Sequence, residues 1–199
     1  MGLSLVLALV ALLFFWAAGV RQRLLASRSA IVQAFAQLEP QLHRRHEALA
    51  DLTEALRALA PQARDALERV MAARLQVMAA AELVRNGPAL AGPIKSLDLA
   101  EAGVAQAVVG LAAWIEAAQT AQTAQTAPTG PVPEPTPESD LLLAWQRLTA
   151  ARQSVQFASQ SCNQCLSRHN AAVVRLPARV VAAGMGLSAL PLLTVVEHG

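Results

Sequence analysis

The chain has 199 residues, enough for one membrane segment and one ordinary domain. Hydrophobic residues make up 54% of it and aromatic residues only 4%, with no tyrosine, so the residues that favour β-sheets are scarce and we expect an all-α protein. A formal net charge of +2 does not indicate a nucleic-acid partner, and two cysteines do not form the disulfide framework of a small secreted domain.

The stretch GLSLVLALVALLFFWAAGV, residues 2–20, carries no charge. A helix of this length spans about 30 Å, the thickness of a bilayer's hydrocarbon core, and the segment lacks the basic start of a secretory signal peptide. Arg21, Arg23 and Arg28 follow it. Because basic flanks stay in the cytoplasm, we predict a transmembrane anchor at 1–20 with the N-terminus outside and the domain in the cytoplasm.

A cleaved export signal is the alternative for this segment. The small triplet Ala17-Ala18-Gly19 resembles a cleavage site. Cleavage there would export a mature protein that lacks residues 1–18.

A leucine-rich stripe with alternating spacings of four and three follows the anchor. Its members are Ile31, Phe35, Leu38, Leu42, Leu49, Leu52, Leu56 and Leu59. This is the heptad repeat of helices that pack along their length, as in a coiled coil. The repeat has one gap, filled by Arg45, so we predict a single cation on the buried stripe. Arg44, His43 and His46 lie beside the stripe, and we expect them to fan outward.

Proline and glycine divide the next part of the chain. Pro40 predicts a kink or a helix restart near residues 36–40, and Pro61 predicts a second kink or the start of the next helix. The apolar face after Pro61 runs towards Val84, with both methionines expected in the core; it comprises Leu67, Val70, Met71, Leu75 and Met78.

The motifs Asn86-Gly87-Pro88 and Gly92-Pro93 then break the helical pattern. We expect the following helix to begin near Ser96 or Asp98. Its inner side is expected to comprise Leu97, Val104, Val108, Leu111 and Ile115.

A Gln-Thr-Ala repeat runs into a proline-rich stretch at residues 119–139. Such a segment buries no core, so we predict a disordered linker between a first bundle region, 21–118, and a long final helix, 140–179. The apolar line of that helix comprises Leu141, Trp145, Leu148, Val155, Cys162, Leu166, His169, Val173 and Leu176, with Arg152 and Ser159 as polar interruptions. Together these segments predict an antiparallel bundle of about four long helices.

The chain ends in an apolar tail, 180–199, whose residues 180–196 are uncharged. Gly184, Gly186 and Pro191 interrupt it, and it is short for a membrane span. We expect a tail that lies at the membrane interface or caps the bundle, with a second span as the alternative.

Residues 34–47 read AFAQLEPQLHRRHE. This run resembles the LemA family, in which A-W-x-Q-I-D leads into V-Q-L-K-R-R and an acidic, leucine-rich continuation. Phe35 replaces the family's Trp and Glu39 replaces its Asp. The residues that match are Ala34, Gln37, Gln41, Leu42, Arg44 and Arg45.

The second half of the chain carries the same resemblance. The family has two Tyr-Asn pairs seven residues apart, then Phe-Pro and a small-residue stretch with glycine. Here the pairs are Cys162-Asn163 and His169-Asn170, followed by Leu176-Pro177 and the small residues of 182–186. Both asparagines and the proline keep register, whereas both tyrosines are replaced.

The resemblance implies a single-pass protein of the bacterial inner (plasma) membrane with a cytoplasmic helical bundle and no established active site. We therefore expect a non-enzymatic scaffold or interaction module without a cofactor, whose protein partner the sequence does not identify. Nucleotide-binding, serine-hydrolase and zinc-protease motifs do not occur in the sequence.

The first candidate site is a structural polar network around Arg44 and Arg45. A buried cation needs a partner, so we expect these arginines to bind carboxylate or amide groups of a facing helix. Asn163 and Asn170 are the candidate amide partners.

The alternative function is a metal- or redox-responsive protein. It would use one face of the final helix together with the histidine pair of the first; the candidate ligands are Cys162, Cys165, His169, His43 and His46. Cysteine is often buried without such a role, so the primary expectation is that no metal is bound.

Overall fold

The computed structural model describes residues 2–123, 137–175 and 177–194, and all regular structure within them is helical. The all-α prediction is therefore confirmed. In order, the elements are α1 (Gly2–Leu59), the 3-10 helix η1 (Pro61–Ala63), α2 (Arg64–Asn86), α3 (Ala91–Thr123), α4 (Pro137–Val174) and α5 (Ala178–Gly184).

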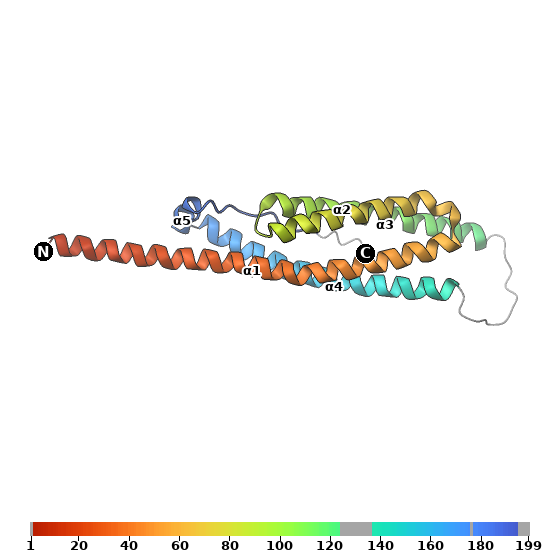
Figure 1. The fold of residues 1–199 in the computed structure, drawn as a ribbon, viewed down its shortest axis with the longest axis horizontal. Helices are drawn as coiled ribbons and strands as arrows, with labels where there is room; N and C mark the ends of the chain where they lie inside the picture. Colours follow the sequence, from red (N-terminus) through yellow and green to blue (C-terminus); the bar gives the residue numbers. More distant parts are fainter. Residues whose placement is uncertain (1, 124–136, 176, 195–199) are drawn as a thin grey trace.

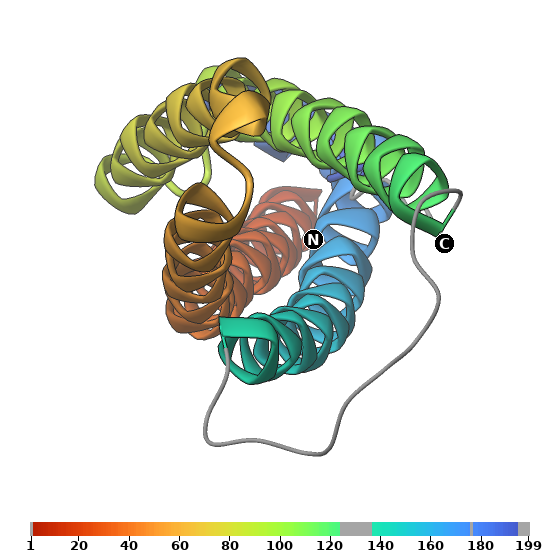
Figure 2. The same ribbon diagram turned by 90° about the vertical axis from the view of Figure 1, so that its right-hand side faces the viewer.

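The long helices form two layers that run back and forth along the molecule (Figure 1). The second half of α1 packs chiefly against α4, and α2 packs chiefly against α3. Seen from the end far from the N-terminus, α2 and α3 form one layer, and α1 and α4 form the other (Figure 2). The first third of α1 projects beyond the bundle (Figure 1).

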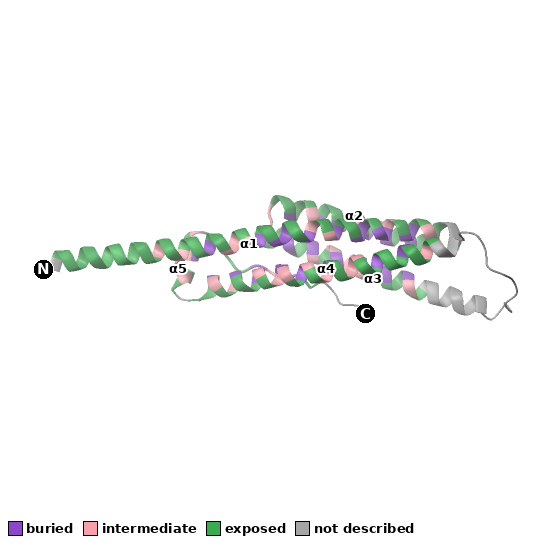
Figure 3. Ribbon diagram, turned by 90° about the horizontal axis from the view of Figure 1, so that it is seen from below, coloured by how far each residue is buried: buried purple, intermediate pink, exposed green. Residues whose placement is uncertain are grey.

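That projecting segment exposes its apolar side chains (Figure 3). Leu3 is 76% exposed and Phe15 is 74% exposed, although both are large hydrophobic residues. An uncovered apolar helix of this length is long and apolar enough to cross a membrane. α3 also passes that test of length and composition over Ala91–Ala113, but part of this window is buried in the bundle.

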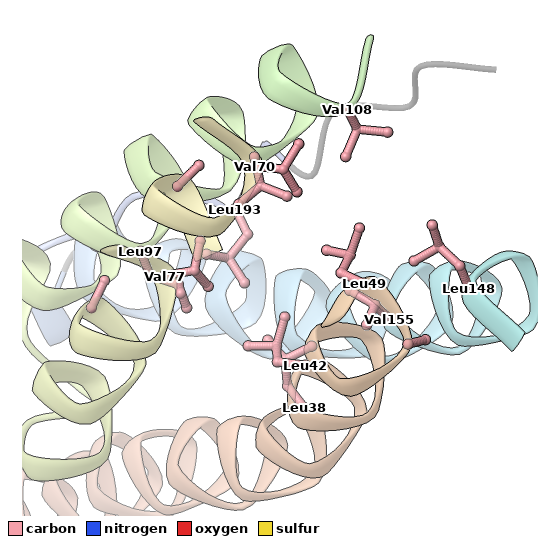
Figure 4. Close-up of a cluster of buried hydrophobic side chains, with 14 of the residues drawn as sticks. Leu38, Leu42, Leu49, Val70, Val77, Leu97, Val108, Leu148, Val155 and Leu193 are labelled. Atoms are coloured by element: carbon pink, nitrogen blue, oxygen red, sulfur yellow. The ribbon is translucent and has the colours of Figure 1, made fainter. Parts of the chain in front are cut away.

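The stripe on α1 forms one side of the core. Ile31, Leu38, Leu49 and Leu52 are each at most 1% exposed, and Arg45 is buried among them. The core is completed by apolar residues of the other elements, as Figure 4 shows for Val70 and Val77 of α2, Leu97 and Val108 of α3, Leu148 and Val155 of α4, and Leu193 of the tail. The side chains of Leu59 and Ile115 lie outside the described part of the chain.

α1 continues through Pro40 without a restart, so the restart that the sequence allowed does not occur. Pro40 is exposed, which places its ring on the solvent face, where a helix can curve and water can solvate the carbonyl group that loses its hydrogen bond. Pro61 does begin a new element, because it opens η1 immediately before α2.

The predicted inner face of α2 was partly wrong. Leu75 is 62% exposed and Met78 is 37% exposed, while Met71 is half-buried. The face that is buried comprises Leu67, Val70, Ala73, Val77, Ala80 and Val84. Alanine is common on both faces of this protein's helices, so the sequence does not show which alanines are buried. The prediction therefore followed the larger Leu75 and Met78, which lie off the buried face.

Helix boundaries also differ from the prediction. α3 begins at Ala91, several residues before Ser96, because glycine and proline are tolerated in a first helical turn, where the amide groups have no intrahelical acceptor. α4 ends at Val174, and Pro177 separates it from α5, so the final helix does not reach 179. Trp145, which was expected on the apolar line of this helix, is 41% exposed, and the neighbouring Ala144 is buried in its place.

The helical ends flanking the predicted linker extend into it. α3 reaches Thr123 and α4 begins at Pro137. Residues 124–136 lie outside the described part of the chain, so the prediction of disorder there stays a prediction. Leu176, which was expected on the apolar line of the final helix, also lies outside the described residues.

Candidate functional site

A buried ion pair joins α1 to α3 in the middle of the bundle. The Nη2 atom of Arg45 donates to both carboxylate oxygens of Glu101, each at 2.6 Å. The two residues are 8% and 7% exposed, so both charges are largely removed from water. The predicted cation on the stripe therefore has a carboxylate partner on a facing helix.

Glu101 was the residue that sequence reasoning missed. It occupies one position of a heptad line on α3, and the other members of that line are Ile94, Leu97, Val104, Val108 and Leu111, all buried. A polar residue interrupting an apolar heptad is the same signal that identified Arg45 on α1. Matching the two interruptions makes Glu101 a candidate partner for Arg45, because opposite charges on packed stripes can neutralise each other.

Two more polar side chains with buried nitrogen atoms are His46 of α1 and Arg74 of α2. His46 is 3% exposed, and neither of its ring nitrogens has a hydrogen-bond partner within the described protein. The Nε atoms of Arg45 and of Arg74 on α2 are likewise buried without a partner. Burial, followed by the positive charges of Arg45 and Arg74 and the nearby His43, lowers the pKa of His46 to about 3. His46 is therefore a neutral base at neutral pH, and the expectation that it points outward was wrong.

His43 and Arg44, the other two residues expected to point outward, do face solvent. Arg44 is exposed, and His43 lies 3.2 Å from Glu47 one turn further along the exposed face of α1. The predicted network of Arg44 and Arg45 with Asn163 and Asn170 is not formed by the hydrogen bonds of these residues. Arg45 takes a carboxylate because that group neutralises its charge as well as accepting its hydrogen bonds.

Asn163 and Asn170 hold the tail instead, and we call this pair the asparagine clamp. The side chain of Asn170 accepts from the backbone N–H of Leu190 and donates to the C=O of the same residue, both at 2.7 Å. Asn163 makes the same two bonds to Leu193, both at 2.8 Å. Each amide thus satisfies both backbone groups of one residue, as a neighbouring β-strand would.

The spacing of the clamp fits an extended chain. Seven residues of helix rise about 10 Å, and three residues of extended chain cover about 9–10 Å. Leu190 and Leu193 therefore meet successive asparagines, and both leucine side chains are buried in the core. Thr194 ends the described tail with hydrogen bonds from its N–H and hydroxyl groups to Asp98 of α3.

A tight turn redirects the chain from α5 into this tail. Gly186 has a φ of 65°, and the N–H of Leu187 donates to the C=O of Ala182 at 2.9 Å. This is the hydrogen bond of a Schellman cap, which requires a left-handed residue that glycine adopts without a steric penalty. The tail therefore packs on the bundle, and among the described residues it contains no helix long enough for a second span.

The five candidate metal ligands are not gathered at one point. Within residues 2–123, 137–175 and 177–194, no group of three or more His, Cys, Asp or Glu side chains is placed to hold a metal ion. His169 lies with its Nδ1 atom 2.9 Å from the hydroxyl of Ser27, and burial is the main cause that lowers its pKa. Cys162 is fully buried, and burial raises the pKa of its thiol to about 12.

A small apolar hollow of about 240 Å³ lies between α1 and the α2–α3 pair. Phe35, Leu42 and Val84 line it, and Glu39 and Arg85 stand at its edge with 3.8 Å between their charged groups. The other residues that line it are apolar, and they are Val32, Ala36, Leu38, Ala81, Pro88 and Leu97.

Taken together, the described structure defines an all-α bundle with a buried ion pair, a clamped tail and an uncovered apolar helix at its N-terminus. Comparison with models of known protein families, with curated proteins and with solved structures finds no match.

Proposed function

We propose that this chain is a membrane-anchored, non-enzymatic protein of the LemA type, which serves as a scaffold or interaction module. Residues 2–20 would cross the inner membrane of a bacterium once, with the N-terminus outside and the bundle in the cytoplasm. The observation that carries the proposal is the continuity of α1, a single helix that runs from an exposed apolar segment into the core of the bundle.

This continuity couples the anchor to the bundle. A flexible linker would let a tethered domain tumble, whereas an unbroken helix holds it at a fixed height and tilt above the bilayer. A constant position suits a protein that presents its surface to other membrane components. The buried ion pair supports a structural role, because Arg45 and Glu101 bind each other.

The orientation rests on charge. Arg21, Arg23 and Arg28 follow the apolar segment, and no acidic residue occurs among the first 38. Basic residues close to a span remain on the cytoplasmic side. The asparagine clamp gives both asparagines of the pattern that resembles the LemA family a defined role, which is to hold the tail.

Membrane extraction of the full chain tests the anchor. We expect wild-type protein to stay in the membrane pellet at alkaline pH, and Leu9→Arg with Leu12→Arg to release it, because each arginine at the centre of a span costs about 3 kcal/mol. Leu75→Arg with Leu83→Arg is the matched control; both leucines are exposed on the bundle, and this variant should stay in the pellet. A soluble wild-type chain would refute the anchor, and a product mass lacking residues 1–18 would show cleavage instead.

Affinity capture from cross-linked membranes tests the scaffold role. We expect specific proteins to be captured with the wild-type chain and lost with the Leu9→Arg, Leu12→Arg variant, because the bundle would no longer be held beside them. Turnover of a small-molecule substrate by the purified chain would contradict the non-enzymatic role.

A further inference from the structure

The end of the bundle nearest the N-terminus carries a group of exposed arginines, which we call the basic collar. Its members are Arg21, Arg23, Arg168, Arg175 and Arg179. They come from α1, from the last part of α4 and the residue that follows it, and from α5. These three elements reach further towards the N-terminus than the α2–α3 pair does (Figures 1 and 3).

α5 fixes the height of the collar relative to the apolar segment. Leu24 of α1, Val173 of α4 and Ala182 of α5 form a separate buried cluster, with Val20 and Val181 packed at its edge. Val20 is the last residue of the uncharged stretch 2–20. The short helix therefore lies level with the point where α1 would leave the bilayer.

The parts of α1, α4 and α5 that carry these arginines contain no acidic residue. Residues 1–38 and 141–194 contain no Asp or Glu. At the nearest end of the α2–α3 pair, Glu82 is paired with Arg85 at 2.7 Å, and the carboxylate of Asp98 accepts the hydrogen bonds of Thr194 at the end of the tail. The collar is therefore a one-sign surface, and such surfaces attract the opposite charge.

Exposed apolar side chains accompany the collar. Val174 is 62% exposed and Val180 is 69% exposed, and they lie beside Arg175 and Arg179 in the sequence. Arginines flanking small exposed apolar residues are typical of segments that lie in the interface of a bilayer, with the apolar groups inserted and the cations at the headgroups.

We propose that the basic collar and α5 are seated on the bilayer surface and bind the phosphate groups of anionic phospholipids. The arginines would donate to headgroup phosphates, and Val174 and Val180 would enter the interface. Arginine suits this role because its planar guanidinium group pairs with phosphate through two parallel hydrogen bonds. The inference rests on the membrane anchor of the proposed function and adds the class of lipid that this end recognises.

Hydrogen exchange of the full chain in lipid nanodiscs tests the proposal. One set of discs contains phosphatidylcholine only, and the other also contains phosphatidylglycerol. Each basic residue at an anionic surface contributes about a fivefold preference. Arg175 and Arg179 together should therefore make hydrogen exchange in residues 172–187 up to about 30-fold slower in the anionic discs than in the phosphatidylcholine discs.

Two charge-reversal variants of equal net charge separate the collar from general electrostatics. Arg175→Glu with Arg179→Glu should abolish the lipid-dependent slowing in residues 172–187. Arg44→Glu with Arg147→Glu should retain it, because both arginines are exposed and Arg44 lies about 36 Å along α1 from residue 20. Unchanged exchange in α2 and α3 would show that both variants remain folded.

Several results would overturn the proposal. They are equal exchange in the two kinds of disc, loss of the effect in both variants alike, and slowing by inorganic phosphate added to phosphatidylcholine discs, which would identify a free-anion site. A chain that fails to elute with the discs would refute the anchor and the proposal together, whereas a disc-bound chain without a lipid effect refutes the collar alone.

Discussion

Removing the Arg45 side chain should destabilise the bundle far more than removing its neighbour Arg44. Arg45→Ala leaves the carboxylate of Glu101 buried at 7% exposure without its cation. Breaking a buried pair in this way costs about 3–5 kcal/mol. Arg44 is exposed, so Arg44→Ala should change the free energy of unfolding by no more than about 0.5 kcal/mol.

Thermal unfolding of the full chain in detergent, followed by circular dichroism, measures this difference. For a chain of this length, 1 kcal/mol corresponds to about 2–4 °C in Tm, so Arg45→Ala should lower Tm by about 6–20 °C. Equal Tm values for Arg45→Ala and Arg44→Ala would refute the buried pair.

The double variant Arg45→Met, Glu101→Leu separates loss of a pair from loss of packing. It removes both charges and fills their volume with apolar groups, so its Tm should return to that of the wild type or exceed it. A double variant as unstable as Arg45→Ala would mean that the guanidinium group stabilises the bundle through contacts other than Glu101.

Three further predictions follow from the described side chains. The pKa of His46 falls from 6.5 to about 3 on folding, so in acid the unfolded chain binds a proton that the folded chain does not. The free energy of unfolding should therefore fall by up to about 4 kcal/mol between pH 6.5 and pH 3. When unfolding is measured across this pH range, His46→Leu should lose less stability than the wild type. Replacing both residues of the asparagine clamp with alanine should free residues 186–194 for rapid hydrogen exchange, because four backbone bonds are lost, whereas the exposed Gln164→Ala should not. In native alkylation read by mass spectrometry, Cys165 should react well before Cys162, whose thiol is buried and has a pKa of about 12; faster reaction of Cys162 would revive the redox alternative.

The sequence by itself determined the helical class, the exposed apolar segment and the line of buried residues on α1. These follow from local rules, because a heptad of large apolar side chains can be buried only along one stripe of a helix. It also placed Arg45 on that stripe, since a polar residue at a heptad position lies on the buried face whatever its partner is.

The tertiary structure decided which side chains meet. It paired Arg45 with Glu101, turned His46 inward, and gave Asn163 and Asn170 to the tail rather than to the cation. None of these follows from the spacing within one segment, because each depends on the rotation of one helix against another. In an alanine-rich chain that rotation has little sequence signal, since alanine fits the core and the surface almost equally well.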